Sequence, residues 1–147
     1  MTVENKAADA ALDWIGTPYL HQASQKGSGS DCLGLIRGVW REVVGAEPVT
    51  PPPYTTDWAE PDGQEVLLHA ALQWLVPRSV EHLGRGTVLL FRMRKTAIAK
   101  HLGIVSEVGP HPKFVHAYSG HGVVETSLSL PWRKRIAAAF DFPEGGK

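Results

Sequence analysis

The hydrophobic pattern changes at Gly86, and this change restricts the folds open to the chain. Before Gly86, apolar residues recur at three- and four-residue spacing, which predicts amphipathic helices over 7–15, 32–44 and 62–76. After it, short β-branched and aromatic runs between turn residues predict strands over 87–91, 101–105, 114–118, 123–126 and 136–140. Helices followed by strands favour an α+β fold, with N-terminal helices packed on a C-terminal antiparallel sheet. The polar stretch 21–30 and the five prolines of 48–61 predict loops.

Length, charge and cysteine content exclude several classes of protein. The chain of 147 residues fits one domain, which we expect to span 1–147. Fifteen Lys and Arg balance fifteen Asp and Glu, so no basic field indicates a nucleic-acid partner. Cys32 is the only cysteine, which excludes a disulfide scaffold and thiolate-pair zinc sites. No run approaches the roughly 20 apolar residues of a membrane helix. Residues 1–6 lack the pattern of a signal peptide, so we expect synthesis in the cytoplasm.

Cys32 follows a Gly/Ser-rich loop and stands at the expected start of a helix, where Ser30 or Asp31 would cap it. A lone cysteine is commonly a buried, inert hydrophobe. At a helix start, however, free backbone N–H groups and the helix dipole stabilise a thiolate. With one imidazolium nearby, we expect the pKa of the thiol to fall by about two units, which leaves it mostly ionised at neutral pH. Cys32 is therefore the candidate nucleophile.

The candidate base is one of seven histidines, and sequence spacing alone does not select it. His101 opens an expected strand, and Gly103 on the same face leaves room for a group beside the ring. His116 lies on the next strand, and a hairpin would bring the two strands to about 5 Å. We therefore expect His116 to hold His101 in the required tautomer. His21 and His121 are loop residues that fit the rim of a cleft.

Zinc is the alternative use for so many histidines. His111, His116 and His121 are spaced by five, so successive ones would face opposite sides of a strand. No HExxH motif is present. We therefore expect no metal and no other cofactor.

Three stretches taken together resemble the NlpC-like family of cell-wall cysteine peptidases, a branch of the papain-like fold. Residues 16–19 (Gly-Thr-Pro-Tyr) are similar to the family's turn ahead of the nucleophile. Residues 31–35 (Asp-Cys-Leu-Gly-Leu) resemble its Asp-Cys-Ser-Gly pattern, with Leu33 in place of the serine. Residues 101–105 (His-Leu-Gly-Ile-Val) resemble its His-x-Gly-Ile pattern, with His116 as the polar residue on the next strand. Thr87 replaces an aspartate that is frequent in the family.

The resemblance implies a papain-like NlpC-type fold and a role for each site residue. Cys32 would be the nucleophile, His101 the general base and acid, and His116 the orienting residue. The Tyr19 hydroxyl and the backbone N–H of Cys32 would stabilise the oxyanion. Asp31 would line the substrate pocket, whereas the sequence alone also fits a plain helix cap.

The resemblance also implies a peptidoglycan hydrolase that cleaves amide bonds of stem peptides. The chain looks most like the peptidases of phage tails and gene transfer agents, in which the particle carries the enzyme to the periplasm. A tail hub would then be a partner, docked on a patch around Tyr54 and Trp58 or around Trp132, although these aromatics also fit ordinary core packing. Two alternatives stay open. One is an amidase or acyl transferase with the same Cys/His site, and the other is a non-catalytic baseplate module.

Overall fold

The computed structural model of the protein describes residues 2–49, 51, 54 and 64–144. Four helices are found in this part of the chain: α1 (Val3–Asp13), α2 (Cys32–Val43), α3 (Val66–Trp74) and α4 (Leu130–Arg133). None of the helices in these residues is long and apolar enough to cross a membrane. The strands are β1 (Ser24–Gln25), β2 (Gly29–Ser30), β3 (Val76–Arg78), β4 (Val88–Phe91), β5 (His101–Glu107), β6 (Lys113–Tyr118), β7 (Gly122–Ser127) and β8 (Ile136–Asp141).

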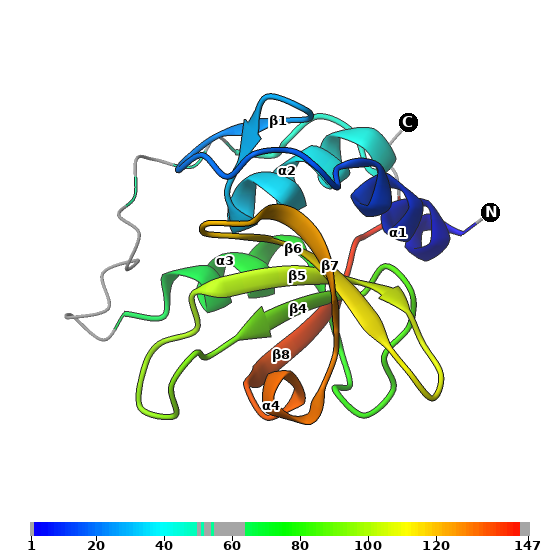
Figure 1. Ribbon diagram of the computed structural model, residues 1–147, viewed down its shortest axis with the longest axis vertical. Helices are drawn as coiled ribbons and strands as arrows, with labels where there is room; N and C mark the ends of the chain where they lie inside the picture. Colours follow the sequence, from blue (N-terminus) through cyan, green and yellow to red (C-terminus); the bar gives the residue numbers. More distant parts are fainter. Residues whose placement is uncertain (1, 50, 52–53, 55–63, 145–147) are drawn as a thin grey trace.

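Six strands form one antiparallel sheet in the order β3-β8-β4-β5-β6-β7. Strands β4 to β7 are neighbours in both sequence and space, so they are joined as successive antiparallel hairpins. In Figure 1, α1 and α2 lie together on one side of this sheet and α4 lies on the other. The predicted α+β architecture, with helices before an antiparallel sheet, is confirmed.

The two faces of the sheet bury two separate apolar clusters. Alternate residues of β5 divide between them, because successive side chains of a strand point to opposite faces. Leu102 and Ile104 pack in the larger cluster with the helices. Val105 packs in the smaller cluster, against which Trp132 of α4 rests. His101 therefore begins a strand whose odd-numbered positions face away from α1 and α2.

Local signals explain where the helices begin and end. The Thr2 side chain accepts a hydrogen bond from the N–H of Asn5 and caps α1. Gly16 follows α1 with φ +97°, a conformation that favours glycine. Asp31 caps α2, as the sequence predicts. Ile15, expected on the apolar face of the first helix, lies beyond its end and is exposed.

Three short elements depart from the sequence predictions. The polar stretch 21–30, predicted as a loop, contains the β1–β2 hairpin. The helix predicted over 62–76 is described only as Val66–Trp74, and Val76 begins β3 instead. Pro77 fits β3 because this strand lies at the sheet edge. Helix α4 was not predicted, since it is only four residues long. Most of the proline-rich stretch 48–61, including Trp58, lies outside the described residues.

Candidate active site

Cys32 is the first residue of α2, and its neighbours explain the local motif. The Asp31 carboxylate accepts a hydrogen bond from the Gly34 N–H at 2.8 Å, which closes the helix cap. A Cβ at Gly34 would lie 1.9 Å from the carbonyl oxygen of Ala23. Only glycine therefore lets the chain before the helix cross its first turn this closely. The aspartate and the glycine of the motif together place Cys32 at the helix N-terminus.

The thiol lines a cavity of about 190 Å³ that also contains His101. The side chains around it include Tyr19, Asp31, Cys32, Tyr54, His101 and Tyr118. Cys32 is 7% exposed, and its Sγ lies 3.8 Å from the carbonyl oxygen of Lys100, the residue before His101. The structure thus brings the candidate nucleophile and the candidate base to one cavity.

His101 and His116 form a hydrogen-bonded pair across β5 and β6. The His101 Nε2 lies 2.7 Å from the His116 Nδ1, and the two rings are T-shaped. This contact leaves the Nδ1 of His101 as the nitrogen available to a reacting group. The His116 Nε2 lies 2.8 Å from the Thr126 Oγ1. His116 is 1% exposed, and both of its ring nitrogens have a hydrogen-bond partner within the protein.

Aromatic rings enclose this pair on the α4 face of the sheet. The Phe114 and Trp132 rings lie 4.4 Å and 5.2 Å from the His116 ring. A Cβ at Gly103 would lie 2.8 Å from the Phe114 ring, so the space that this glycine leaves is taken by Phe114. Burial and the neighbouring His116 lower the pKa of His101 to about 3. Burial and the nearby His121 lower the pKa of His116 to about 4, so both rings are neutral at pH 7.

The predicted thiolate is corrected by the burial of the thiol. Burial and the Asp31 carboxylate raise the pKa of Cys32 to about 12. Backbone N–H groups, including that of Cys32 itself, lower the pKa by less. The backbone N–H groups at the helix start therefore lower the pKa of the thiol as expected, but burial raises this pKa by more. The free site contains a neutral thiol beside a neutral imidazole.

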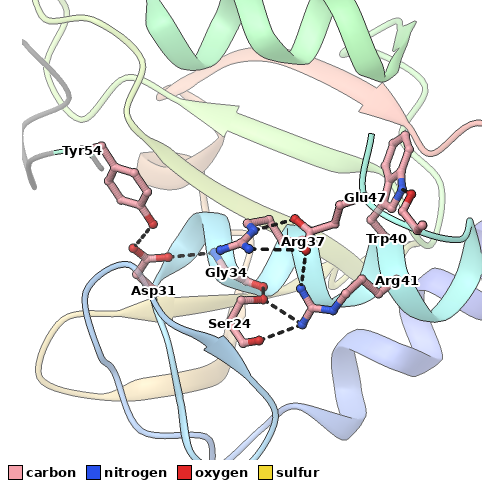
Figure 2. Close-up of polar contacts among 9 residues, drawn as sticks. Ser24, Asp31, Gly34, Arg37, Trp40, Arg41, Glu47 and Tyr54 are labelled. Carbon is pink, nitrogen blue, oxygen red and sulfur yellow. Dashed lines mark hydrogen bonds and ion pairs between the residues drawn. The ribbon is translucent and has the colours of Figure 1, made fainter. Parts of the chain in front are cut away.

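Asp31 ties three parts of the chain together, and Figure 2 shows its contacts with Gly34 and Tyr54. One oxygen accepts the Gly34 N–H, and the other accepts the Gln22 N–H at 2.7 Å and the Tyr54 hydroxyl. The side chain lines the cavity but is 4% exposed, and His21 Nδ1 lies 3.8 Å away. Asp31 is therefore a helix cap with both oxygens already hydrogen-bonded within the chain.

The segment after α2 is fixed to this helix at Glu47, also visible in Figure 2. The Glu47 carboxylate lies 2.7 Å from Arg37 and 2.9 Å from Arg41. Arg41 also donates to the backbone oxygen of Ser24 at 2.7 Å. These contacts, with Tyr54 on Asp31, connect the segment to the wall of the cavity.

Tyr19 lies at the cavity in an isolated parallel bridge with Ser30. Burial, Cys32 and Asp31 raise the pKa of its hydroxyl, which keeps it protonated and able to donate. Its predicted role at the oxyanion stays a prediction.

The arrangement of the histidines does not favour the zinc alternative. In the described residues, no three His, Cys, Asp or Glu side chains gather as a metal site. His116 has both nitrogens engaged, and His121 stacks on Tyr118.

Comparison with known proteins shows which sequences and structures this chain resembles. No protein-family model matches the chain. The chain is 31% identical over 138 residues to the murein DD-endopeptidase MepS/murein LD-carboxypeptidase of Escherichia coli K12. The match covers 93% of this chain and 62% of that protein, and the protein of E. coli O157:H7 matches equally. The chain thus spans about three fifths of the curated relatives it matches.

Solved structures share the fold over nearly the whole chain. The NlpC/p60 domain of the peptidoglycan hydrolase SagA superposes with a TM-score of 0.66 at 21% identity, covering 95% of this chain and 98% of that one. An NLP/P60 family protein of Staphylococcus aureus gives 0.61 at 20% identity, covering 97% and 42%. The chain therefore shares the fold of NlpC/p60 domains. Within this fold, the described residues supply the helices, the sheet and the cavity given above.

Several contacts at this site were not predicted. Tyr54 was a candidate for docking or for ordinary packing; its hydroxyl donates to Asp31 and its ring packs edge-on against His21. Trp132 was left with the same two alternatives, and it packs on the histidine pair. The position of Thr126 follows from strand pairing. It lies opposite Phe114 in the β6–β7 register, so its side chain is on the same face of the sheet as that of His116.

Proposed function

We propose that the chain is a cysteine peptidase that hydrolyses amide bonds in the stem peptides of peptidoglycan. The observation that carries this proposal is the single cavity shared by Cys32, at a helix N-terminus, and His101, paired with His116. The similarity to a murein endopeptidase and to the NlpC/p60 domain of a peptidoglycan hydrolase supports the choice of substrate. We also propose that the whole of 1–147 forms one such domain.

In the proposed mechanism, the thiol proton moves to the Nδ1 of His101 as the Cys32 sulfur attacks the carbonyl carbon. The oxyanion accepts hydrogen bonds from the Cys32 N–H and the Tyr19 hydroxyl. The His101 imidazolium then protonates the leaving amine, and the C–N bond breaks to leave a thioester. His101 next takes a proton from water as the water attacks the thioester. The C–S bond then breaks, the Cys32 sulfur takes this proton back from His101, and the acid is released. His116 accepts the Nε2–H of His101 throughout and orients the ring.

The test is product analysis by mass spectrometry on purified peptidoglycan. Wild-type protein should release stem-peptide fragments, and Cys32→Ala should release none while melting at a similar temperature. His69→Gln is the matched control, because His69 is exposed on α3. Activity should survive a chelator.

Each alternative gives a different result in the same experiment. An amidase would separate the glycan from intact stems, and an acyl transferase would join a stem to an added amine. Peptide release by Cys32→Ala would refute the proposed nucleophile. No release by wild type would favour a non-catalytic module. Slow alkylation of Cys32 does not identify such a module, because burial already raises the pKa of this thiol.

We further propose, from the resemblance of the three motifs alone, that a tail-like particle delivers the enzyme to the periplasm and that a tail hub is its partner. The relatives compared above are cell-wall enzymes, and their names mention no particle. Mass spectrometry of purified tail-like particles from the source cells tests this proposal. Absence of the chain from such particles would refute it.

A further inference from the structure

A line of hydrogen bonds continues from the histidine pair to a hydroxyl on the next strand. His101, His116 and Thr126 lie on β5, β6 and β7, which are consecutive in the sheet. The two contacts measure 2.7 Å and 2.8 Å. Strand β7 is the edge of the sheet, and Thr126 is half-buried there. The line therefore runs from the cavity toward water.

Only two arrangements of protons satisfy both contacts when the rings are neutral. In the first, the His116 Nε2–H donates to Thr126, the His101 Nε2–H donates to His116, and the His101 Nδ1 has a free lone pair. In the second, every donor is reversed, and the His101 Nδ1 bears a proton that prevents it from acting as a base. Which tautomer a histidine adopts is set by the hydrogen bond at its other nitrogen.

Each group of the line has the partner that the first arrangement requires. Half-buried Thr126 can donate its hydroxyl proton to water while its oxygen accepts from His116. His116 is 1% exposed, so its Nε2–H has no access to water. The rings of Phe114 and Trp132 pack on the imidazole and oppose its rotation.

We infer that Thr126 is a positioning residue that accepts the Nε2–H of His116 and thereby leaves the Nδ1 of His101 unprotonated and open to the cavity. The inference extends the proposed function, since the free Nδ1 matters only if His101 acts as a base. An isosteric valine would leave the His116 N–H buried without an acceptor, which is costly. The second arrangement would then become the more stable one.

The test compares Thr126→Val with Thr126→Ser, which restores the hydroxyl. Ser127→Val is the matched control, because Ser127 lies on the same strand and points to the other face. Long-range proton–nitrogen NMR correlations of the imidazoles report the tautomers without any substrate. We expect the Nε2–H tautomer of His116 in wild type, Thr126→Ser and Ser127→Val, and the Nδ1–H tautomer in Thr126→Val. On peptidoglycan fragments, Thr126→Val should lower kcat roughly ten- to hundredfold with little change in KM.

The two readouts separate this inference from the proposed function. An unchanged His116 tautomer in Thr126→Val overturns the inference, whatever the activity. A shifted tautomer in a protein whose wild type releases no peptide supports the role of Thr126 and refutes the proposed function. If Thr126→Val does not fold, Thr126→Ala provides the same comparison, since it also lacks the hydroxyl.

Discussion

Acidification should destabilise this protein through His101 and His116, because both rings are held neutral in the folded chain, and substitution of His116 isolates its share. The pKa of His116 is lowered from 6.5 to about 4, with burial as the main cause. Below pH 6.5 the unfolded chain binds a proton that the folded chain does not, so stability falls as the pH falls from 6.5 to about 4. At about 1.4 kcal/mol per pH unit, the loss over this range is about 3.5 kcal/mol. This is a large part of the stability of a typical small domain.

The experiment measures urea unfolding by tryptophan fluorescence at about pH 7 and about pH 4.5. His116→Gln retains polar atoms but does not titrate, so its loss of stability between these two pH values should be about 2.5 kcal/mol smaller than that of wild type. His69→Gln, which removes an exposed histidine, should behave as wild type. The comparison is made within each variant between two pH values, so any destabilisation of His116→Gln at pH 7 cancels. Equal losses in wild type and His116→Gln would refute the claim that the ring is held neutral.

Three further predictions follow from the cavity wall. Tyr54→Phe removes a donor to the buried Asp31 carboxylate and should cost about 1–3 kcal/mol, measured by thermal unfolding; an unchanged melting temperature would contradict this. Gly34→Ala should destabilise by at least about 3 kcal/mol, because its Cβ meets the backbone oxygen of Ala23 at 1.9 Å; a folded variant with wild-type stability would show that the chain there moves freely. At about pH 8, iodoacetamide should alkylate Cys32 more than about tenfold more slowly than a free cysteine peptide, because burial raises its pKa to about 12; a rapid reaction would indicate a preformed ion pair.

The parts that the sequence predicts well are those set by local chemistry. Asp31 at the start of α2 follows from capping, and the meeting of His101 with His116 follows from strand spacing. The state of the Cys32 thiol could not be predicted, because it depends on how much water the folded chain removes. The contact of Tyr54 with Asp31 joins residues 23 positions apart, and Tyr54 itself lies in a proline-rich stretch without helix or strand periodicity. No local pattern encodes such a contact.

A neutral thiol and a neutral imidazole place more of the catalytic requirement on the second histidine. In a preformed thiolate–imidazolium pair, the cost of separating charge is met when the protein folds. Here, on the proposed mechanism, the imidazolium first forms as Cys32 attacks, inside a cavity that offers little water to stabilise it. The developing charge on His101 can be stabilised through its Nε2–H, which His116 accepts at 2.7 Å. That acceptor exists only in the tautomer that Thr126 would select, so the hydroxyl at the sheet edge should affect the rate at the Cys32 sulfur through His101, two strands away.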